Sequence, residues 1–137
     1  MTKTAKEIQG DFMSFLRGTT LASAVNGQIY RKGYRPRDSK AEDIVVTFMS
    51  GRTSQIQTGI VLVQIFVPDI DPFNNGVFVE DGARTEQLER TAQDWLDNLN
   101  PATINYKISL NGTISTDYDE DINQHFVVMM LDYDLFN

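Results

Sequence analysis

The stretch Ile60-Val61-Leu62-Val63-Gln64-Ile65-Phe66-Val67 decides the fold class of this chain. Its β-branched residues favour an extended strand, which we expect to run from about Ile56 to Val67 and to end at Pro68-Asp69. Val61, Val63, Ile65 and Val67 line one face, and Ile60, Leu62 and Phe66 line the other, where Gln64 interrupts them. A strand that is apolar on both faces must be covered on both, so the stretch predicts a central strand between two layers.

Three further segments carry strand patterns. Ile44–Ser50 is rich in β-branched residues, and the polar connector Gly51–Gln55 joins it to the central strand at hairpin length. Apolar and polar residues alternate from Ile104 to Leu110, which is typical of a strand with one buried and one solvent-exposed face. A final strand is expected over about His125–Tyr133.

The dipeptide Asn111-Gly112 favours a type I′ turn, because both positions tolerate a left-handed backbone. The sequence therefore predicts a hairpin at this point, with Thr113–Thr116 returning along the preceding strand.

Helical periodicity appears in two regions. Apolar residues spaced by three and four predict helices over residues 7–17 and, most strongly, Thr85–Leu99. A second short helix, capped by Thr19 or Thr20, is expected before Asn26-Gly27. Residues 68–83 form a turn-rich excursion, in which Val77, Phe78 and Val79 are expected to anchor a small lobe.

The element order predicts an α+β fold: an antiparallel β-sheet with an amphipathic helix packed on one face and a short N-terminal helical region. The chain has 137 residues, of which 41% are hydrophobic and 23% charged. These values are ordinary for a globular protein, and we find no linker or repeat, so residues 1–137 are expected to form a single domain.

Composition excludes several classes of function. The chain has no cysteine and one histidine, which excludes disulfide frameworks, thiol nucleophiles, cysteine-based zinc sites and multi-histidine metal sites. The net charge of −7 disfavours nucleic-acid binding by the whole surface. No long apolar run follows the lysines of Met1–Glu7, and the apolar stretches Ile60–Val67 and Phe126–Leu131 are too short to span a bilayer, so a soluble intracellular domain is expected.

Two patterns match part of a known functional motif, and the rest of each motif is missing. Asp117-x-Asp119-x-Asp121 resembles the start of a calcium loop, but Ile122 and Val128 occupy the positions that require Gly and Glu. His125 could be grouped with Ser115 and a carboxylate of Asp117–Asp121, yet the sequence has no nucleophile motif around Ser115. We therefore expect no catalytic residue, no metal site and no cofactor.

The strongest local anomaly is a basic segment, residues 31–40, which we call the basic loop. It carries five of the 12 basic residues and one acidic residue, a local charge of +4, and Gly33 and Pro36 oppose regular structure. An exposed loop is expected. It is either an ordinary solvated loop or a contact surface, because Tyr34 between arginines is typical of interface hot spots.

The acidic segment 117–121 offers this loop a partner of opposite charge, since residues 117–137 hold six acidic residues and no Lys or Arg. A positive patch that meets a negative patch elsewhere on the next copy gives a head-to-tail contact, which can close into a ring. The candidate interaction residues are Arg31, Lys32, Tyr34, Arg35, Arg37, Lys40, Asp117, Asp119, Glu120 and Asp121.

In order along the chain, a set of short motifs resembles the tail-terminator, or tail-completion, proteins of long-tailed bacteriophages and prophages. These motifs are Gly27-Gln28-Ile29-Tyr30, Arg35-Pro36-Arg37-Asp38-Ser39, Glu42-Asp43-Ile44-Val45-Val46, Ile65-Phe66-Val67-Pro68-Asp69 and the helix Thr85–Leu99. The acidic Asp119-Glu120-Asp121 before the last strand is also similar to these proteins. The resemblance spans roughly residues 7–135, and the excursion over Pro68–Gly82 is longer than the family pattern.

The resemblance implies a virion structural protein of the phage tail, assembled in the bacterial host cytoplasm. Such a protein forms a ring, commonly a hexamer, on the tail tube, ends its polymerisation and offers a surface for head joining. Its partners would be copies of itself, the tail-tube protein and head–tail connector proteins, with no membrane, nucleic acid, catalytic residue or cofactor. The alternatives are a neck or head–tail joining protein, a nucleic-acid-binding module that uses the basic loop, and a small hydrolase that uses His125.

Overall fold

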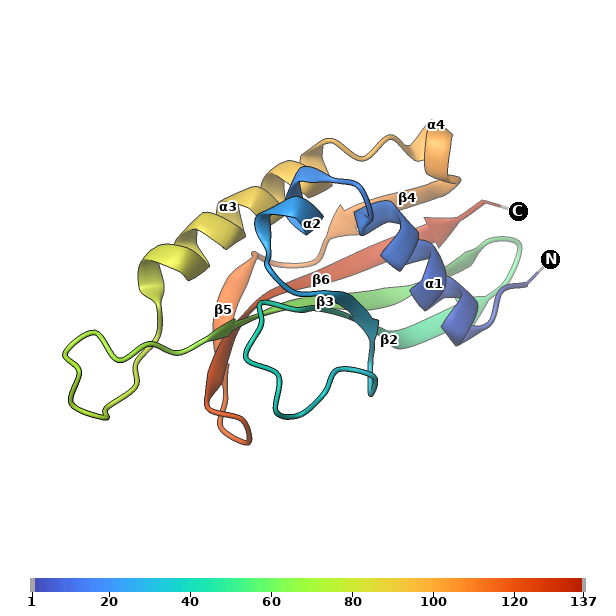
Figure 1. Cartoon of the computed structure of the whole chain (residues 1–137). Helices are drawn as coiled ribbons and strands as arrows, with labels where there is room; N and C mark the ends of the chain where they lie inside the picture. The colour runs from blue at the N-terminus through green and yellow to red at the C-terminus, as the bar shows by residue number, and fades with distance from the viewer. Residues whose placement is uncertain (1, 137) are drawn as a thin grey trace.

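The computed structural model describes residues 2–136 and shows the expected α+β fold (Figure 1). Three helices, a long mixed sheet and one further helical turn make up these residues. In chain order the elements are α1 (Ala5–Leu16), α2 (Thr20–Ala24), β1 (Ile29–Arg31), β2 (Ile44–Thr53), β3 (Gln57–Pro68), α3 (Gly82–Asp97), α4 (Pro101–Ile104), β4 (Tyr106–Leu110), β5 (Ser115–Asp119) and β6 (Gln124–Leu135).

The sheet is centred on two long antiparallel strands, β3 and β6. The strand order is β1-β2-β3-β6-β4, and β5 also pairs with β6. All pairings are antiparallel except that of β1 with β2, a three-residue parallel pair at one lateral edge. The predicted antiparallel sheet is therefore confirmed, with one short parallel strand that the sequence pattern did not indicate.

The hairpin predicted at Asn111-Gly112 is wrong. β4 lies along residues 131–135 of β6 and β5 lies along residues 124–128, so both strands run in the same direction beside one edge of β6. Gly112 does adopt a left-handed φ of 85°, but Ile114 then turns into the core, where only 8% of it is exposed. Burial of that side chain requires the chain to continue along β6, and the reversal comes later, at Asn123 with φ 53°.

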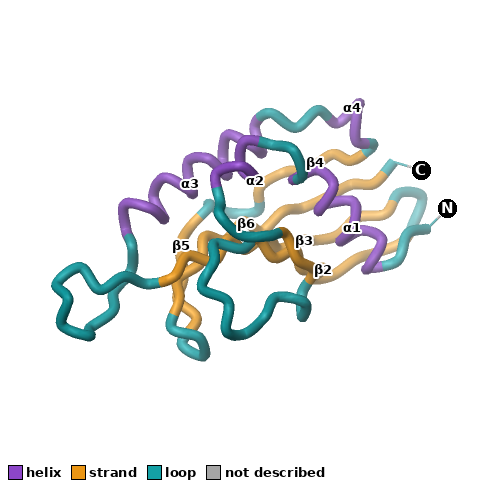
Figure 2. The backbone as a smooth tube through the Cα atoms, in the orientation of Figure 1, coloured by secondary structure: helices purple, strands orange, loops and turns teal. Residues whose placement is uncertain are grey.

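Side-chain caps begin the helices. Thr4 and Glu7 form a reciprocal capping box at the start of α1, and the hydrogen bonds from Thr4 hold the pKa of Glu7 below its usual value. Thr19 caps α2, as expected, and Asp81 accepts a hydrogen bond from the Arg84 backbone N–H at the start of α3. Figures 1 and 2 show these three helices on one side of the sheet.

The core lies between those helices and the sheet. Residues Val61, Val63, Ile65 and Val67 of β3 face the helices and are almost completely buried, as predicted for that face. Four aromatic rings meet at the far end of this layer: Phe12, Phe15, Tyr106 and Tyr133. Burial raises the pKa of both tyrosines, and the Tyr106 hydroxyl donates to Asp11 Oδ2 at 2.7 Å.

The second face of the sheet is not covered by any helix of residues 2–136, although a cover on both faces was expected. Alternation along the paired strands places on this face Phe66, which lies under Arg35, and five further hydrophobic side chains of β3 and β6. We call these five residues the open face: Ile60, Leu62, Phe126, Val128 and Met130. All are half-buried by their neighbours except Met130, which is exposed, so the sheet presents an apolar surface that no helix of residues 2–136 covers and that Asp117 and Asp132 border on the same face.

Candidate interaction surfaces

The basic loop follows β1 and returns to the start of β2, below the sheet in Figure 1. Five of its candidate residues have side chains at the surface. Lys32, Tyr34, Arg37 and Lys40 are exposed, and Arg31, in β1, is half-buried. These positions agree with the prediction of an exposed, mainly basic segment.

Arg35 is the exception, because only 8% of its side chain is exposed. Its Nε donates to Asp43 Oδ2 at 2.9 Å, and its Nη2 donates to Gln124 Oε1 at 2.9 Å and to the Ala41 carbonyl at 3.2 Å. The guanidinium carbon lies 4.3 Å from the centre of the Phe66 ring. A guanidinium that stacks on an aromatic ring while its N–H groups are satisfied is well suited to burial.

Asp43 completes this cluster from the start of β2, with 1% of its side chain exposed. Its Oδ1 accepts from the Gln28 backbone N–H at 2.9 Å, and its Oδ2 also accepts from the Ser39 hydroxyl at 2.6 Å. Gln124 Nε2 donates in turn to the Ser39 carbonyl at 2.8 Å. The basic loop is therefore fixed across one end of the open face, and Arg35 belongs to the fold rather than to an accessible contact surface.

A second ion pair lies next to the first. Arg84 of α3 binds Glu42 through Nε at 2.7 Å and Nη2 at 2.8 Å, and also donates to the Ala24 carbonyl. The hydrogen bond to Glu42 raises the pKa of Arg84. Gly27 has no space for a side chain here, since a Cβ would lie 2.1 Å from Asp43 Oδ1. These contacts tie α2, the basic loop and α3 together.

The acidic residues occupy the hairpin that joins β5 to β6. Asp117, Glu120 and Asp121 are exposed, and Asp119 is half-buried, with its Oδ1 accepting from the Asp121 backbone N–H at 3.1 Å. β5 forms one lateral edge of the sheet, while β1 and the start of the basic loop form the other. The basic loop does not stay at the β1 edge: it crosses to β6, where Arg35 and Ser39 bind Gln124, and Lys40 lines a hollow with Tyr118 and Asn123 beside the acidic turn.

His125 lies on the helix side of the sheet, at the start of β6. Its Nδ1 is 2.7 Å from Asp69 Oδ1, its Nε2 is 3.5 Å from Glu80 Oε1, and its ring lies 4.9 Å from that of Tyr118. Ser115 pairs with Val128 and so lies on the other face of the sheet. The serine, histidine and acidic-run grouping considered from the sequence is therefore not assembled, and the carboxylates beside His125 come from residues 68–83.

Those carboxylates mark the two ends of a projecting segment, which we call the 69–80 hairpin (Figures 1 and 2). Ile70 and Val79 exchange two backbone hydrogen bonds of 2.9 Å, and Asp71 accepts from the backbone N–H groups of Asn75 and Gly76. The side chains expected to anchor a lobe instead face outward. The exposed fractions are 59% for Val77, 62% for Phe78, 43% for Val79 and 80% for Phe73.

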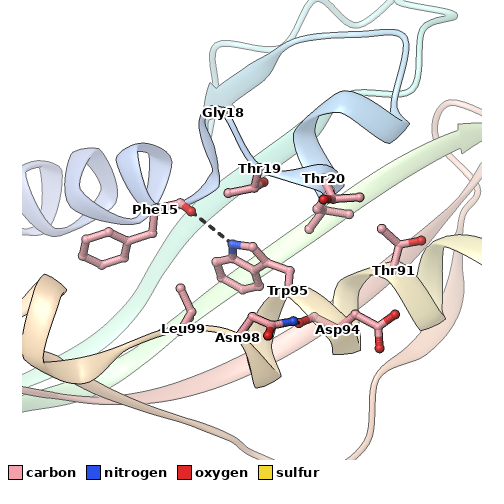
Figure 3. Close-up of a pocket in the computed structure, with 10 residues that line it drawn as sticks. Phe15, Gly18, Thr19, Thr20, Thr91, Asp94, Trp95, Asn98 and Leu99 are labelled. Atoms are coloured by element: carbon pink, nitrogen blue, oxygen red, sulfur yellow. Dashed lines mark hydrogen bonds between the residues drawn. The ribbon is translucent and has the colours of Figure 1, made fainter.

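A groove of about 540 Å³ lies between the α1–α2 turn and α3 (Figure 3). Trp95 forms its floor and donates its indole N–H to the Phe15 carbonyl at 3.1 Å. Its polar lining consists mainly of threonine hydroxyls together with Asp94 and Asn98. The groove therefore presents hydroxyl, carboxylate and amide groups around the Trp95 ring.

Comparison with known proteins adds no family assignment. The chain matches no protein-family model and no curated protein sequence. Among residues 2–136, no helix is both long and apolar enough to cross a membrane. Within the same range, no three acidic or histidine side chains are grouped as metal ligands would be.

Proposed function

We propose that this chain is a virion structural protein of a long-tailed bacteriophage or prophage. It caps the tail tube as a ring of identical subunits, ends tube polymerisation and offers a surface for head joining. The proposal originates in the sequence motifs that resemble tail-terminator proteins. Residues of three of these motifs, Gly27, Arg35, Ser39, Glu42 and Asp43, meet around the two buried ion pairs, which supports reading them as one fold signature.

The observation that carries the proposal is the segregation of charge into a basic loop and an acidic β5–β6 turn. The exposed cations Lys32, Arg37 and Lys40 belong to the loop beyond β1, and Asp117, Glu120 and Asp121 belong to β5 and its turn. Patches of opposite charge on one subunit attract the complementary patches of further copies. Such a head-to-tail contact uses two different patches and closes into a ring when the rotation permits.

The first experiment measures assembly. We expect the protein, alone or mixed with a tail-tube protein, to have a mass several times 15.5 kDa in native mass spectrometry. It should also shorten the tubes that the tail-tube protein forms. A strict monomer that leaves tube length unchanged would contradict the proposal.

Charge reversal tests the basic loop and the acidic turn directly. The combined change Lys32→Glu, Arg37→Glu and Lys40→Glu should weaken the ring, and adding Asp117→Lys, Glu120→Lys and Asp121→Lys should restore it. Arg90→Glu on α3, where 71% of the side chain is exposed, is the matched control and should leave assembly unchanged. Full assembly of the triple-Glu variant would remove the basic loop from the interface.

Electron microscopy of particles that carry a tagged subunit distinguishes the tail end from the neck. A label on the last tube ring supports the terminator function. A label confined to the connector side would instead assign the chain to head–tail joining.

A further inference from the structure

We propose that His125 is a proton-dependent clamp on the base of the 69–80 hairpin. The protonated ring holds both ends of the hairpin, and loss of its proton releases the end at Glu80. This clamp is a property of a single subunit and does not depend on the proposed ring. It follows from the position of one imidazole between two carboxylates.

Both nitrogens of the His125 ring face carboxylate oxygens. Nδ1 lies 2.7 Å from Asp69 Oδ1, and Nε2 lies 3.5 Å from Glu80 Oε1. An ionised carboxylate only accepts hydrogen bonds, and a neutral imidazole has one N–H where the imidazolium has two. Only the protonated ring can therefore present an N–H to each carboxylate. When the ring is neutral and keeps its proton on Nδ1, at the shorter contact, the lone pair of Nε2 faces Glu80.

The two carboxylates belong to the two ends of the hairpin. Asp69 follows β3 with 7% of its side chain exposed, and Glu80 precedes α3. The Thr85 hydroxyl donates to Glu80 Oε2 at 2.6 Å, which leaves Oε1 directed at the histidine. His125, at the start of β6, thus joins both ends of the segment to the sheet.

Other charged or titratable side chains come from the elements packed against this part of β6. They are Lys40 of the basic loop, Asp117, Tyr118 and Asp119 of β5, and Asp81, Arg84 and Glu89 at α3. The Tyr118 ring lies 4.9 Å from that of His125, and its hydroxyl donates to Asn123. Asp117 and Asp119 flank Tyr118 and so lie on the other face of the sheet.

The groups at α3 have partners of their own. Arg84 binds Glu42, Asp81 accepts from the Arg84 backbone N–H, and Glu89 accepts from the Thr116 hydroxyl at 2.6 Å. These contacts do not depend on the charge of the His125 ring. The response to its proton is therefore expected at the hairpin ends.

Loss of the proton affects the two ends differently. Asp69 keeps the N–H of Nδ1, and Lys40 lines the same hollow beside it. Glu80 loses its donor and faces a lone pair instead, so this end of the hairpin loosens. The clamp is complete at lower pH and is weakened as the pH rises through the range in which histidine side chains lose their charge.

The loosening reaches a segment with two exposed aromatic side chains. Ile70 and Val79 lie next to the clamped ends and exchange two backbone hydrogen bonds of 2.9 Å. Beyond them the hairpin carries Phe73 and Phe78, which are 80% and 62% exposed. The charge of His125 thus sets how firmly these two rings are held in place on the subunit.

NMR tests the clamp by following one ring and two amides. The chain has one histidine, so the imidazole resonances report the protonation of His125 directly. Exchange rates of the Ile70 and Val79 amides are divided by their intrinsic values at each pH, from about pH 5.5 to about pH 8.5. Because 38% of the Glu80 side chain is exposed, their protection should fall by only about two- to fivefold as the ring loses its proton. Amides in the middle of the β3–β6 pair should keep constant protection.

Two variants remove the dependence on the proton. In Glu80→Gln the amide can accept from an N–H at Nε2 or donate to its lone pair, so closure no longer requires a charged ring. His125→Gln removes the titrating group itself. Both should show hairpin protection that does not change with pH. Glu86→Gln, an exposed position on α3, is the matched control and should keep the full pH response.

Circular dichroism establishes that each variant is folded, and the test stands if either Gln variant at the clamp folds. A pH response that is present in the unmodified chain and in Glu86→Gln, and lost in the clamp variants, supports the clamp. Constant protection while the His125 ring titrates overturns it, as does a response that survives in a folded clamp variant. The ring function is tested by assembly, so either result leaves it untouched.

Discussion

The basic loop and the 69–80 hairpin are both long connections without helical or strand periodicity. Charged segments are usually exposed and apolar segments usually buried, but these two show the opposite. The basic loop is highly charged, yet it contains Arg35, one of the least accessible charged side chains described here, held by Asp43, Gln124 and the Phe66 ring. The hairpin is rich in aromatic and β-branched residues, yet Phe73 is 80% exposed.

The difference shows that hydrogen-bonding partners, rather than hydrophobicity, decide which of these loops is fixed against the sheet. A buried charge is retained when its ionic and hydrogen-bonding needs are met, which Asp43 and its neighbours achieve for Arg35. An exposed apolar side chain costs the monomer little and becomes useful when a partner buries it. The first loop thus contributes to stability, whereas the second leaves its apolar side chains exposed.

The largest expected effect is from Asp43→Ala. Removal of one partner from this buried pair leaves Arg35 uncompensated, and we expect the free energy of unfolding to fall by about 3–5 kcal/mol. Urea denaturation followed by Trp95 fluorescence measures it. Arg37→Ala, in the same loop but exposed, should change stability by less than about 0.5 kcal/mol. Similar effects of the two substitutions would show that the loop is not fixed as described.

A smaller loss is expected from Ser39→Ala. Its hydroxyl donates to Asp43 Oδ2 at 2.6 Å, and a single hydrogen bond to a charged group that keeps other partners contributes roughly 1–2 kcal/mol. The same denaturation experiment applies. The double variant with Asp43→Ala should be little worse than Asp43→Ala alone, because both changes remove the same interaction. Fully additive losses would instead place Ser39 outside the cluster.

In the hairpin, His125→Ala should act locally. Loss of the contacts to Asp69 and Glu80 frees both ends of the segment, so the amides of Ile70 and Val79 should exchange with solvent roughly tenfold faster. Amides of the β3–β6 pair should keep their protection. Thr116→Ala, which removes a hydrogen bond to Glu89 of α3, is the control. Unchanged exchange at both hairpin amides would remove His125 as their anchor.

The smallest effect on folding is expected from Phe73→Ser. Because the ring is 80% exposed, the free energy of unfolding of the dilute monomer should change by less than about 0.5 kcal/mol. Thermal or urea denaturation at low protein concentration measures it. A fall in the free energy of unfolding of more than about 2 kcal/mol would mean that Phe73 packs within its own subunit.

Periodicity predicted the regular elements well. The spacing of apolar residues located α1, α3 and the long strands, because the alternation of buried side chains is a local property of the sequence. β1 was missed because three residues are too few to show a period. At Asn111-Gly112 a correct local preference for a left-handed glycine was overridden by burial of Ile114, which only the whole sheet determines.

The candidate interaction residues were located less completely. Local charge and turn residues identified the exposed lysines and acidic residues, but they could not identify Arg35 as buried, since its partner Gln124 lies 89 positions away. The 69–80 hairpin was recognised as an excursion, but the outward direction of its aromatic side chains depends on backbone pairing across its base. Strand register, which sequence spacing alone does not supply, also separated Ser115 from His125.

The position of β6 has a consequence for biosynthesis. This strand emerges last from the ribosome among the described elements, yet it pairs with β3, β4 and β5 and supplies Gln124 to the cluster around Arg35. Until it emerges, one edge of the strongly apolar β3 is unpaired. Arg35 of the basic loop also lacks its hydrogen-bonding partner Gln124. Productive folding must therefore wait for the C-terminal strand, because an unpaired apolar strand edge favours aggregation.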